Sequence, residues 1–202
     1  MIVVGLTAGI GAGASTVARL LKKNGFEIIE ADAVARSVLK PNSLEWRKVV
    51  RIFGRQILDK NNGIDRERLG TIAFSSAGNL KRLNKIMLPS ILKKIRSRLK
   101  GLEEQGKDIV ILEAPLLIES GLMKDTDLLV VVTADTKTRI RRIVERDFFY
   151  PEEAVKRINA QLPLETKIEK ADFVINNNGS LSETKKQVEK LSKKIKKMAG
   201  KK

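Results

Sequence analysis

The sequence has 202 residues, of which 42% are hydrophobic and 32% are charged, a balance typical of a folded globular chain with one main core. It contains no cysteine and no histidine, which excludes disulfides, Ser-His-Asp and Cys-His catalysis, and metal sites built on these side chains. Forty Lys and Arg residues against 24 Asp and Glu residues give a net charge of +16, which favours an anionic ligand or partner. The remaining carboxylate, hydroxyl, Lys/Arg and backbone groups suit phosphoryl transfer.

The N-terminal stretch MIVVGL lacks the basic region of a signal peptide, and no apolar run reaches the length of a membrane span. We therefore expect a cytoplasmic protein with no membrane partner. The lysine-rich end, KKIKKMAGKK, is typical of a solvated tail, although an anion-binding segment would have the same composition.

The first part of the chain predicts a strand, a helix and a second strand. Residues 2–6 form an apolar run typical of a buried strand, and an amphipathic helix follows a glycine-rich loop and runs to Gly25. Residues 26–32 predict the second strand, and residues 33–39 predict a short helix that Pro41 ends. This order is a βαβ unit, the building block of parallel sheets.

The middle of the chain, residues 42–105, has no strand pattern. Helical periodicity is centred on 44–53, 65–74 and 79–100, and Pro89 is expected to interrupt the last of these. The turn DKNNGID separates the first two helices. We predict a helical insertion at residues 41–105.

Strands resume after the insertion as continuous apolar runs at residues 108–114, 127–134 and 172–176. Such runs are expected where both faces of a parallel sheet are covered. An arginine-rich helical segment is predicted at 136–161, and a lysine-rich helix at 181–198. The predicted fold is α/β, a parallel sheet with helices on both faces, whose core comprises residues 1–40 and 106–202.

The loop after the first strand, within LTAGIGAGASTVARLL at residues 6–21, is similar to the phosphate-binding pattern G-x-x-x-x-G-K-[ST]. Ala8 occupies the first glycine position, and Ala14 occupies the lysine position. Ser15 falls where a hydroxyl would bind Mg²⁺, and Thr16 could contact a phosphate. Three glycines allow the backbone to approach an anion closely: Gly9, Gly11 and Gly13. The alternative is a turn of small residues that binds nothing.

Glu30 and Asp32 follow the second predicted strand. Ligands of open α/β sheets lie beyond the carboxyl ends of the strands, so both carboxylates are expected near the phosphates. One of the two carboxylates could accept a proton from an attacking hydroxyl or help to hold Mg²⁺. Asp32 could also serve as the N-cap of the next helix.

With these elements in place, the chain resembles the dephospho-CoA kinases through about residue 180. The stretches that carry the resemblance are VGLTAGIGAGASTVA, EADAVAR, FGRQILDKNNGIDRERLGTIAF, EAPLLIESGL, RRIVERD and EEAVKRINAQLPLETKIEKADFVINNNGS. The resemblance implies a three-layer P-loop NTPase fold and transfer of the γ-phosphate of ATP, with Mg²⁺, to the 3′-hydroxyl of dephospho-CoA. The insertion would lie on the CoA side, and residues 136–161 would form a lid.

The resemblance also implies residue roles. The catalytic residues would be Asp32, Arg142 and Arg146, and the metal ligands Ser15 and Asp32. The nucleotide would bind to Gly9, Ile10, Gly11, Ala12, Gly13, Ala14, Ser15, Thr16, Asn177 and Gly179. The substrate side would include Thr7, Asp65, Arg66, Glu113, Pro115 and Leu116.

The sequence departs from the family pattern at Ala14 (lysine), Glu30 (aspartate), Leu88 (histidine) and Asn176 (aspartate). Ala14 matters most, because a hydrogen bond to a charged group contributes about 1.5–3 kcal/mol. We expect nucleotide binding to survive and phosphoryl transfer to be weakened or lost, unless another cation substitutes. Two alternatives remain: a different small-molecule or nucleoside-monophosphate kinase, and a non-catalytic nucleotide- or RNA-binding protein. An aromatic content of 4% disfavours base stacking, so we do not expect a nucleic-acid partner.

Overall fold

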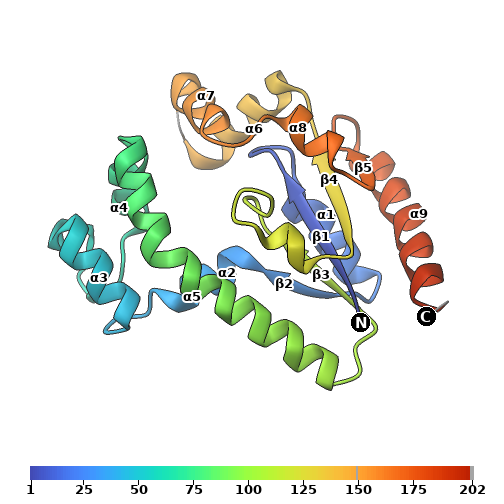
Figure 1. Cartoon of the computed structure of the whole chain (residues 1–202). Coiled ribbons are helices and arrows are strands. Elements are labelled where there is room, and N and C mark those ends of the chain that lie inside the picture. Colours follow the sequence, from blue (N-terminus) through green and yellow to red (C-terminus); the bar gives the residue numbers. More distant parts are fainter. Residues whose placement is uncertain (149, 201–202) are drawn as a thin grey trace. The chain divides into compact units, whose positions relative to one another are not determined.

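A computed structural model describes residues 1–148 and 150–200 (Figure 1). Its five strands form one parallel sheet in the order β2-β3-β1-β4-β5. The strands are β1 (Ile2–Ala8), β2 (Glu27–Glu30), β3 (Ile109–Glu113), β4 (Leu128–Thr133) and β5 (Phe173–Asn176). The predicted α/β class is confirmed, and the carboxyl ends of the strands meet at one edge of the sheet.

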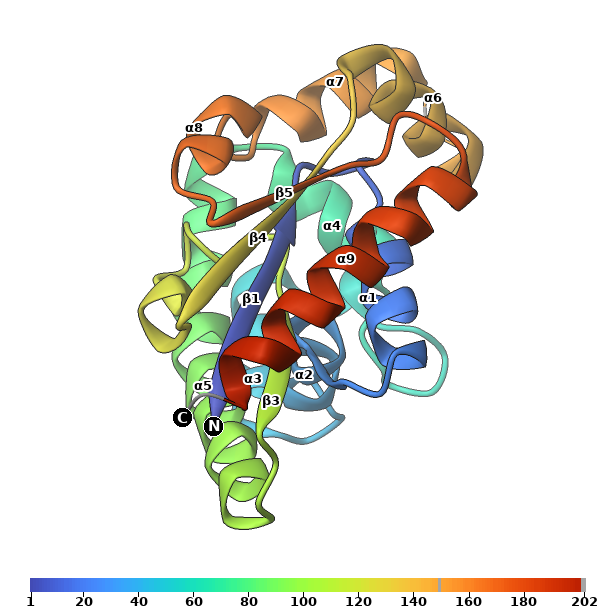
Figure 2. The same ribbon diagram turned by 90° about the vertical axis from the view of Figure 1, so that its right-hand side faces the viewer.

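The chain divides into two compact units, and the first consists of residues 1–30 and 99–202. It contains the sheet and the helices α1 (Ala14–Lys23), α6 (Thr136–Asp147), α7 (Pro151–Asn159), α8 (Leu164–Glu169) and α9 (Leu181–Ala199). A short 3₁₀ helix, η2 (Leu122–Asp125), precedes β4. Figure 2 shows α1 and α9 together along one face of the sheet.

The main core of this unit lies between the sheet and these two helices. Its buried residues alternate along β1 and continue onto the inner faces of α1 and α9, as in Val4, Leu6, Leu21, Val188 and Ile195. The residues between β3 and β4 cover the opposite face, where a Cβ on Gly5 would lie 3.0 Å from Thr126 and 3.1 Å from Leu117. Both faces of β1 are therefore buried, which explains its uninterrupted apolar sequence.

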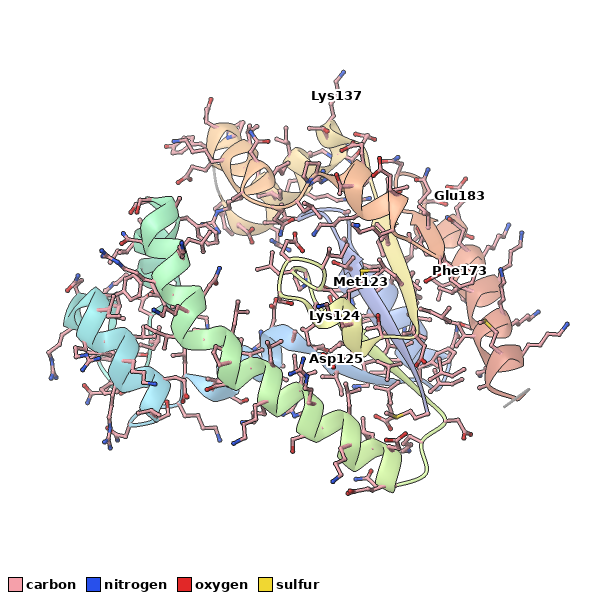
Figure 3. All side chains as sticks on the ribbon, viewed as in Figure 1. Met123, Lys124, Asp125, Lys137, Phe173 and Glu183 are labelled. Atoms are coloured by element: carbon pink, nitrogen blue, oxygen red, sulfur yellow. The ribbon has the colours of Figure 1, made fainter. Side chains whose placement is uncertain are left out.

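The start of α9 is fixed by its own side chains. Ser180 and Glu183 form a capping box, in which each side chain accepts a hydrogen bond from the other residue's backbone N–H. Farther along, the Lys194 ammonium lies 4.3 Å from the ring centroid of Phe173 (Figure 3 labels Phe173 and Glu183). The Lys194–Phe173 contact joins α9 to β5.

The second unit, residues 31–98, is helical. It comprises α2 (Ala31–Val38), α3 (Leu44–Phe53), η1 (Arg55–Ile57), α4 (Arg66–Phe74) and most of α5 (Ala77–Glu104). Its own core includes Val49, Phe53, Ile57, Leu69 and Met87. The predicted turn DKNNGID is present, with Asp59 accepting hydrogen bonds from the N–H groups of Asn61 and Gly63.

The structure corrects two predicted elements and adds one that was not predicted. Helix α5 continues through Pro89, because buried side chains on both sides, such as Met87 and Ile95, keep the helix packed. Strand β2 ends at Glu30, so Asp32 lies in the first turn of α2 and not at its N-cap. The six-residue helix α8 had no predicted counterpart, because it is too short to show a periodic pattern.

In the structure, α2 belongs to the helical unit and the end of α5 belongs to the unit with the sheet. The sequence analysis had instead predicted a core of residues 1–40 and 106–202. The segment 136–161 forms α6 and α7, with residue 149 outside the described residues. The last two lysines of the predicted tail also lie outside them. Within residues 1–148 and 150–200, no helix has the length and apolarity needed to cross a membrane.

Candidate functional site

The glycine-rich loop connects β1 to α1 at the carboxyl edge of the sheet. Gly11 and Gly13 have φ angles of 81° and 95°, a region that residues with a Cβ rarely occupy. Helix α1 begins at Ala14 with no side-chain cap and no acidic residue in its first turn. The first N–H groups of α1 therefore have no side-chain acceptor, and they and the positive end of the helix dipole are available to an anion.

Three side chains from the C-terminal half of the chain hold this loop. The Nε of Arg139 donates to the Ile10 carbonyl oxygen at 2.9 Å, and the Ile10 N–H donates to Oε1 of Gln161 at 2.9 Å. The Nδ2 of Asn177 donates to the Ala12 carbonyl oxygen at 2.8 Å. The loop conformation is therefore specified by residues of α6, of the segment after α7 and of the segment after β5.

The close approach of these side chains explains the glycines. A Cβ on Gly9 would lie 2.6 Å from Nη2 of Arg139, and a Cβ on Gly11 would lie 2.6 Å from the Arg139 carbonyl oxygen. A Cβ on Gly13 would overlap the side-chain amide of Asn177. Burial lowers the pKa of the Arg139 guanidinium, and the nearby Glu165 carboxylate counteracts this.

The two predicted catalytic arginines of α6 have different surroundings. The Nη2 of Arg142 donates to the Asn177 carbonyl oxygen at 2.9 Å, and its Nη1 is buried without a hydrogen-bond partner in the described structure. This nitrogen lies 3.9 Å from the position of a Cβ on Gly13, so it is an unused donor beside the loop. Arg146 instead forms two hydrogen bonds with Asp147, at 2.8 and 2.7 Å, which raise the pKa of Arg146.

Side-chain oxygens that could bind a metal ion gather at the carboxyl ends of β1, β2 and β3. The Oγ of Ser15 donates to Oε1 of Glu113 at 3.3 Å, and Glu113 is the register partner of Glu30 in the neighbouring strand. A hydroxyl and carboxylates are the ligand types that Mg²⁺ prefers. No group of three or more Asp or Glu residues arranged for a metal occurs in the described part of the chain, so these residues would need phosphate or water oxygens to complete such a site.

Three of the residues predicted on the substrate side lie near the end of β1 or just after β3: Thr7, Pro115 and Leu116. The Oγ1 of Thr7 donates to the Pro115 carbonyl oxygen at 3.1 Å, while the Leu116 side chain stays partly exposed. The same Pro115 oxygen accepts a hydrogen bond from Lys167, a fully buried residue that the sequence analysis did not single out.

Three further predicted site residues of the first unit lie among local structural contacts: Thr16, Asn177 and Gly179. The Asn177 amide is used on both sides, because its Oδ1 also accepts a hydrogen bond from Thr184 at 2.8 Å. A Cβ on Gly179 would meet the Glu183 carboxylate of the capping box. Thr16 accepts a hydrogen bond from Arg19 at 3.3 Å through its hydroxyl oxygen.

Three predicted site residues belong to the helical unit. Asp32 is exposed in the first turn of α2. Asp65 is the N-cap of α4 and accepts hydrogen bonds from the N–H groups of Glu67 and Arg68, while Arg66 is exposed as the first residue of that helix. Their environment within their own unit is therefore that of helix starts.

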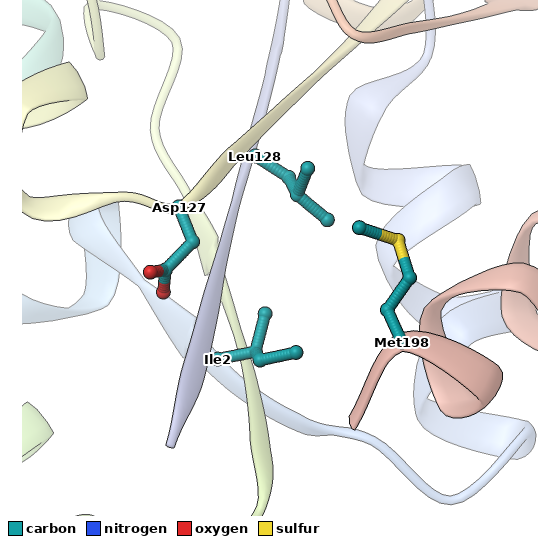
Figure 4. Close-up of a pocket in the computed structure, with 4 residues that line it drawn as sticks. All are labelled: Ile2, Asp127, Leu128 and Met198. Atoms are coloured by element: carbon teal, nitrogen blue, oxygen red, sulfur yellow. The ribbon is translucent and has the colours of Figure 1, made fainter. Parts of the chain in front are cut away.

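A small cavity of about 270 Å³ lies at the opposite edge of the sheet, where β1 and β4 begin (Figure 4). Ile2, Leu128 and Met198 supply its apolar lining. The fourth lining residue, Asp127, accepts a hydrogen bond from the Val3 N–H at 2.7 Å. Its carboxylate is thus used within the sheet, and the cavity does not belong to the candidate site.

Comparison with known proteins extends this description. A family model described as dephospho-CoA kinase matches residues 2–183. Dephospho-CoA kinase from Carboxydothermus hydrogenoformans is 41% identical over 186 residues, which cover 92% of this chain and 90% of that protein. The corresponding enzyme from Geobacillus kaustophilus is 42% identical over 185 residues and covers 92% of both chains.

The similarity extends to a solved structure. The structure of dephospho-CoA kinase from Campylobacter jejuni superposes with a TM-score of 0.71 at 32% identity. The match covers 96% of this chain and 97% of that one.

Proposed function

The chain belongs to the dephospho-CoA kinase family, and on this premise we propose that it transfers the γ-phosphate of ATP to the 3′-hydroxyl of dephospho-CoA. The observation that best supports a polyphosphate ligand is the buried, unpartnered Nη1 of Arg142 beside Gly13. A buried guanidinium nitrogen without an acceptor is unfavourable, and a phosphate oxygen would satisfy it.

The loop would bind the phosphates mainly through its backbone. The uncapped N–H groups at the start of α1 and the helix dipole do not depend on the side chain at position 14. Arg139, Gln161 and Asn177 hold the loop carbonyl and N–H groups of Ile10 and Ala12, so little ordering would remain for the nucleotide to impose.

Ser15 and Glu113 would help to hold Mg²⁺, because their oxygens are 3.3 Å apart at the carboxyl edge of the sheet. When bound, Mg²⁺ neutralises charge on the phosphate oxygens. This assignment adds Glu113, first predicted on the substrate side, to the expected ligands Ser15 and Asp32.

Asp32 would accept the proton of the attacking 3′-hydroxyl. It follows Glu30, the last residue of β2, by two positions in the chain. Its exposed carboxylate is compatible with a general base. Arg142 and Arg146 would stabilise negative charge on the transferred group, Arg146 after exchanging its present partner Asp147.

Ala14 would weaken transfer more than binding. The missing ammonium would have offered a charged hydrogen bond of about 1.5–3 kcal/mol, equivalent to roughly ten- to more than a hundredfold. Since phosphoryl transfer depends on positioning and charge stabilisation, this loss should fall largely on kcat.

Acceptor choice tests the proposal. ADP release should be measured with dephospho-CoA and, in parallel, with nucleoside monophosphates, using both this chain and the Ala14→Lys variant. Dephospho-CoA alone should support turnover, and it alone should raise the Tm of the nucleotide-bound chain. Turnover of a nucleoside monophosphate in preference to dephospho-CoA would assign the chain a different acceptor and contradict the proposal.

A further inference from the structure

Lys167 carries a fully buried ammonium group that no step of the proposed transfer uses. It lies in α8, the short helix that follows the arginine-rich segment. A buried ammonium is unfavourable unless its N–H groups have acceptors, so its partners indicate which parts of the structure it joins.

Each of the three N–H donors has an acceptor. The Nζ lies 2.9 Å from the Pro115 carbonyl oxygen, 2.9 Å from Oε1 of Glu119 and 3.5 Å from the Ala8 carbonyl oxygen. With its donors used and its side chain closed to solvent, Lys167 does not replace the lysine missing at position 14.

The acceptors come from the two loops that flank the candidate site. Ala8 is the last residue of β1 and the first position of the phosphate loop. Pro115 and Glu119 belong to residues 114–119, here called the acceptor loop, because Pro115 and Leu116 were predicted to shape the acceptor pocket. Lys167 therefore connects the start of the phosphate loop to the acceptor loop.

Two further contacts strengthen this connection. The Thr7 hydroxyl donates to the same Pro115 oxygen at 3.1 Å. The Leu162 N–H donates to Oε1 of Glu119 at 3.2 Å, so this carboxylate also holds the chain that leaves the arginine-rich segment. The Lys167–Glu119 pair thus lies where the phosphate loop, the acceptor loop and the end of that segment meet.

We propose that Lys167 is a positioning residue for phosphoryl transfer, which fixes the acceptor loop against the start of the phosphate loop. The inference rests on the proposed function for the role of the acceptor loop. Its effect on the phosphate loop does not, because that effect is measurable as nucleotide affinity.

The test replaces Lys167 with methionine, which has a similar length and no N–H donors. The Kd of a fluorescent ATP analogue with Mg²⁺ should rise about tenfold, as expected for lost hydrogen bonds to a charged group. In the Ala14→Lys background, kcat should fall by about tenfold or more, and by a larger factor than KM for dephospho-CoA rises, because the change affects geometry. The matched control is Lys170→Met at the exposed end of α8, which should change neither value by more than about twofold.

A structural role alone would lower Tm and leave Kd and kcat within about twofold of the parent values below the transition, and this result would overturn the proposal. If Lys167→Met does not fold, Glu119→Gln decides the matter, because it removes only the negative charge and keeps an oxygen acceptor. An unchanged nucleotide Kd in Glu119→Gln overturns the proposal, and a Kd raised by about threefold supports it. Absence of turnover in the Ala14→Lys parent would contradict the proposed function and leave the nucleotide-affinity result to judge Lys167.

Discussion

Replacing Gly13 with alanine should destabilise the chain by about 2–4 kcal/mol, more than the same replacement at Gly25, which has a similar φ but open surroundings. Gly13 has a φ of 95°, and an added Cβ would overlap the Asn177 amide that donates to the Ala12 carbonyl oxygen. Gly25 is the matched control, since its φ is 90° and no atom lies within 4 Å of an added Cβ.

The two sites separate backbone strain from steric overlap. A left-handed backbone conformation costs an L-residue about 1–2 kcal/mol of folding stability. Alanine offsets about 0.4–1 kcal/mol of this, because it lowers the conformational entropy of the unfolded chain. Gly25→Ala should therefore destabilise the chain by about 1 kcal/mol. At Gly13 the loss of the Asn177 hydrogen bond adds about 0.5–1.5 kcal/mol, and displacement of the amide adds to that. Gly13→Ala should also weaken nucleotide binding, whereas Gly25→Ala should not.

Urea denaturation followed by far-UV circular dichroism measures both costs. The single tryptophan, Trp46, lies in the helical unit, so its fluorescence would report mainly on that unit. In an Asn177→Ala background the overlap is removed, and the additional cost of Gly13→Ala should be smaller than in the parent. Equal costs at Gly13 and Gly25, or an unchanged cost in the Asn177→Ala background, would refute the reasoning.

Three other substitutions test separate parts of the site and the fold. Arg142→Met should raise the Kd of an ATP analogue by about tenfold or more, because the unused Nη1 donor is lost. Arg141→Met, at an exposed position of the same helix, serves as the control. Equal changes in Kd from the two substitutions would contradict a contact between Arg142 and the nucleotide. In the Ala14→Lys background, Asp32→Asn should lower kcat by about 10²–10⁴-fold with little change in the nucleotide Kd, and an unchanged kcat would exclude Asp32 as the base. Asp135→Ala should lower Tm at neutral pH by roughly 2–4 °C, since Asp135 is the N-cap of α6, while Asp135→Asn should lower it by less, because its amide oxygen still accepts the cap hydrogen bond but carries no charge. The hydrogen bond from the Thr138 N–H lowers the pKa of Asp135, so this stabilisation is present above the carboxyl's unfolded pKa and lost as the pH falls through its folded pKa. The Tm difference between Asp135→Ala and the parent should therefore shrink in acid, and a difference that persists would contradict this origin.

The sheet and the loop position were predictable because their signals are local. The apolar runs of β1 and β4 and the glycines after β1 specify a strand, a turn and a helix within a short stretch. Helix α3 was also predicted at 44–53 from its helical periodicity, and the structure shows that Ser43 caps its start.

The roles of Arg139 and Lys167 were not predictable, because they depend on contacts between distant segments. Arg139 is separated from Ile10, and Lys167 from Ala8, by well over a hundred residues. In the sequence Arg139 is one of several arginines in its segment, and Lys167 follows a charged pattern typical of exposed helices. Only the packed structure shows that both are buried and that their donors face loop carbonyl groups.

Phosphorylation of dephospho-CoA by this chain and by its Ala14→Lys variant, measured side by side with the phosphorylated product identified by mass spectrometry, tests the central claim most directly. We predict the same product from both, a modestly lower nucleotide affinity in the unsubstituted chain, and a kcat that increases about tenfold or more on restoring the lysine. Nucleotide binding without phosphorylated dephospho-CoA from either protein would contradict the assignment of this site as that of a dephospho-CoA kinase.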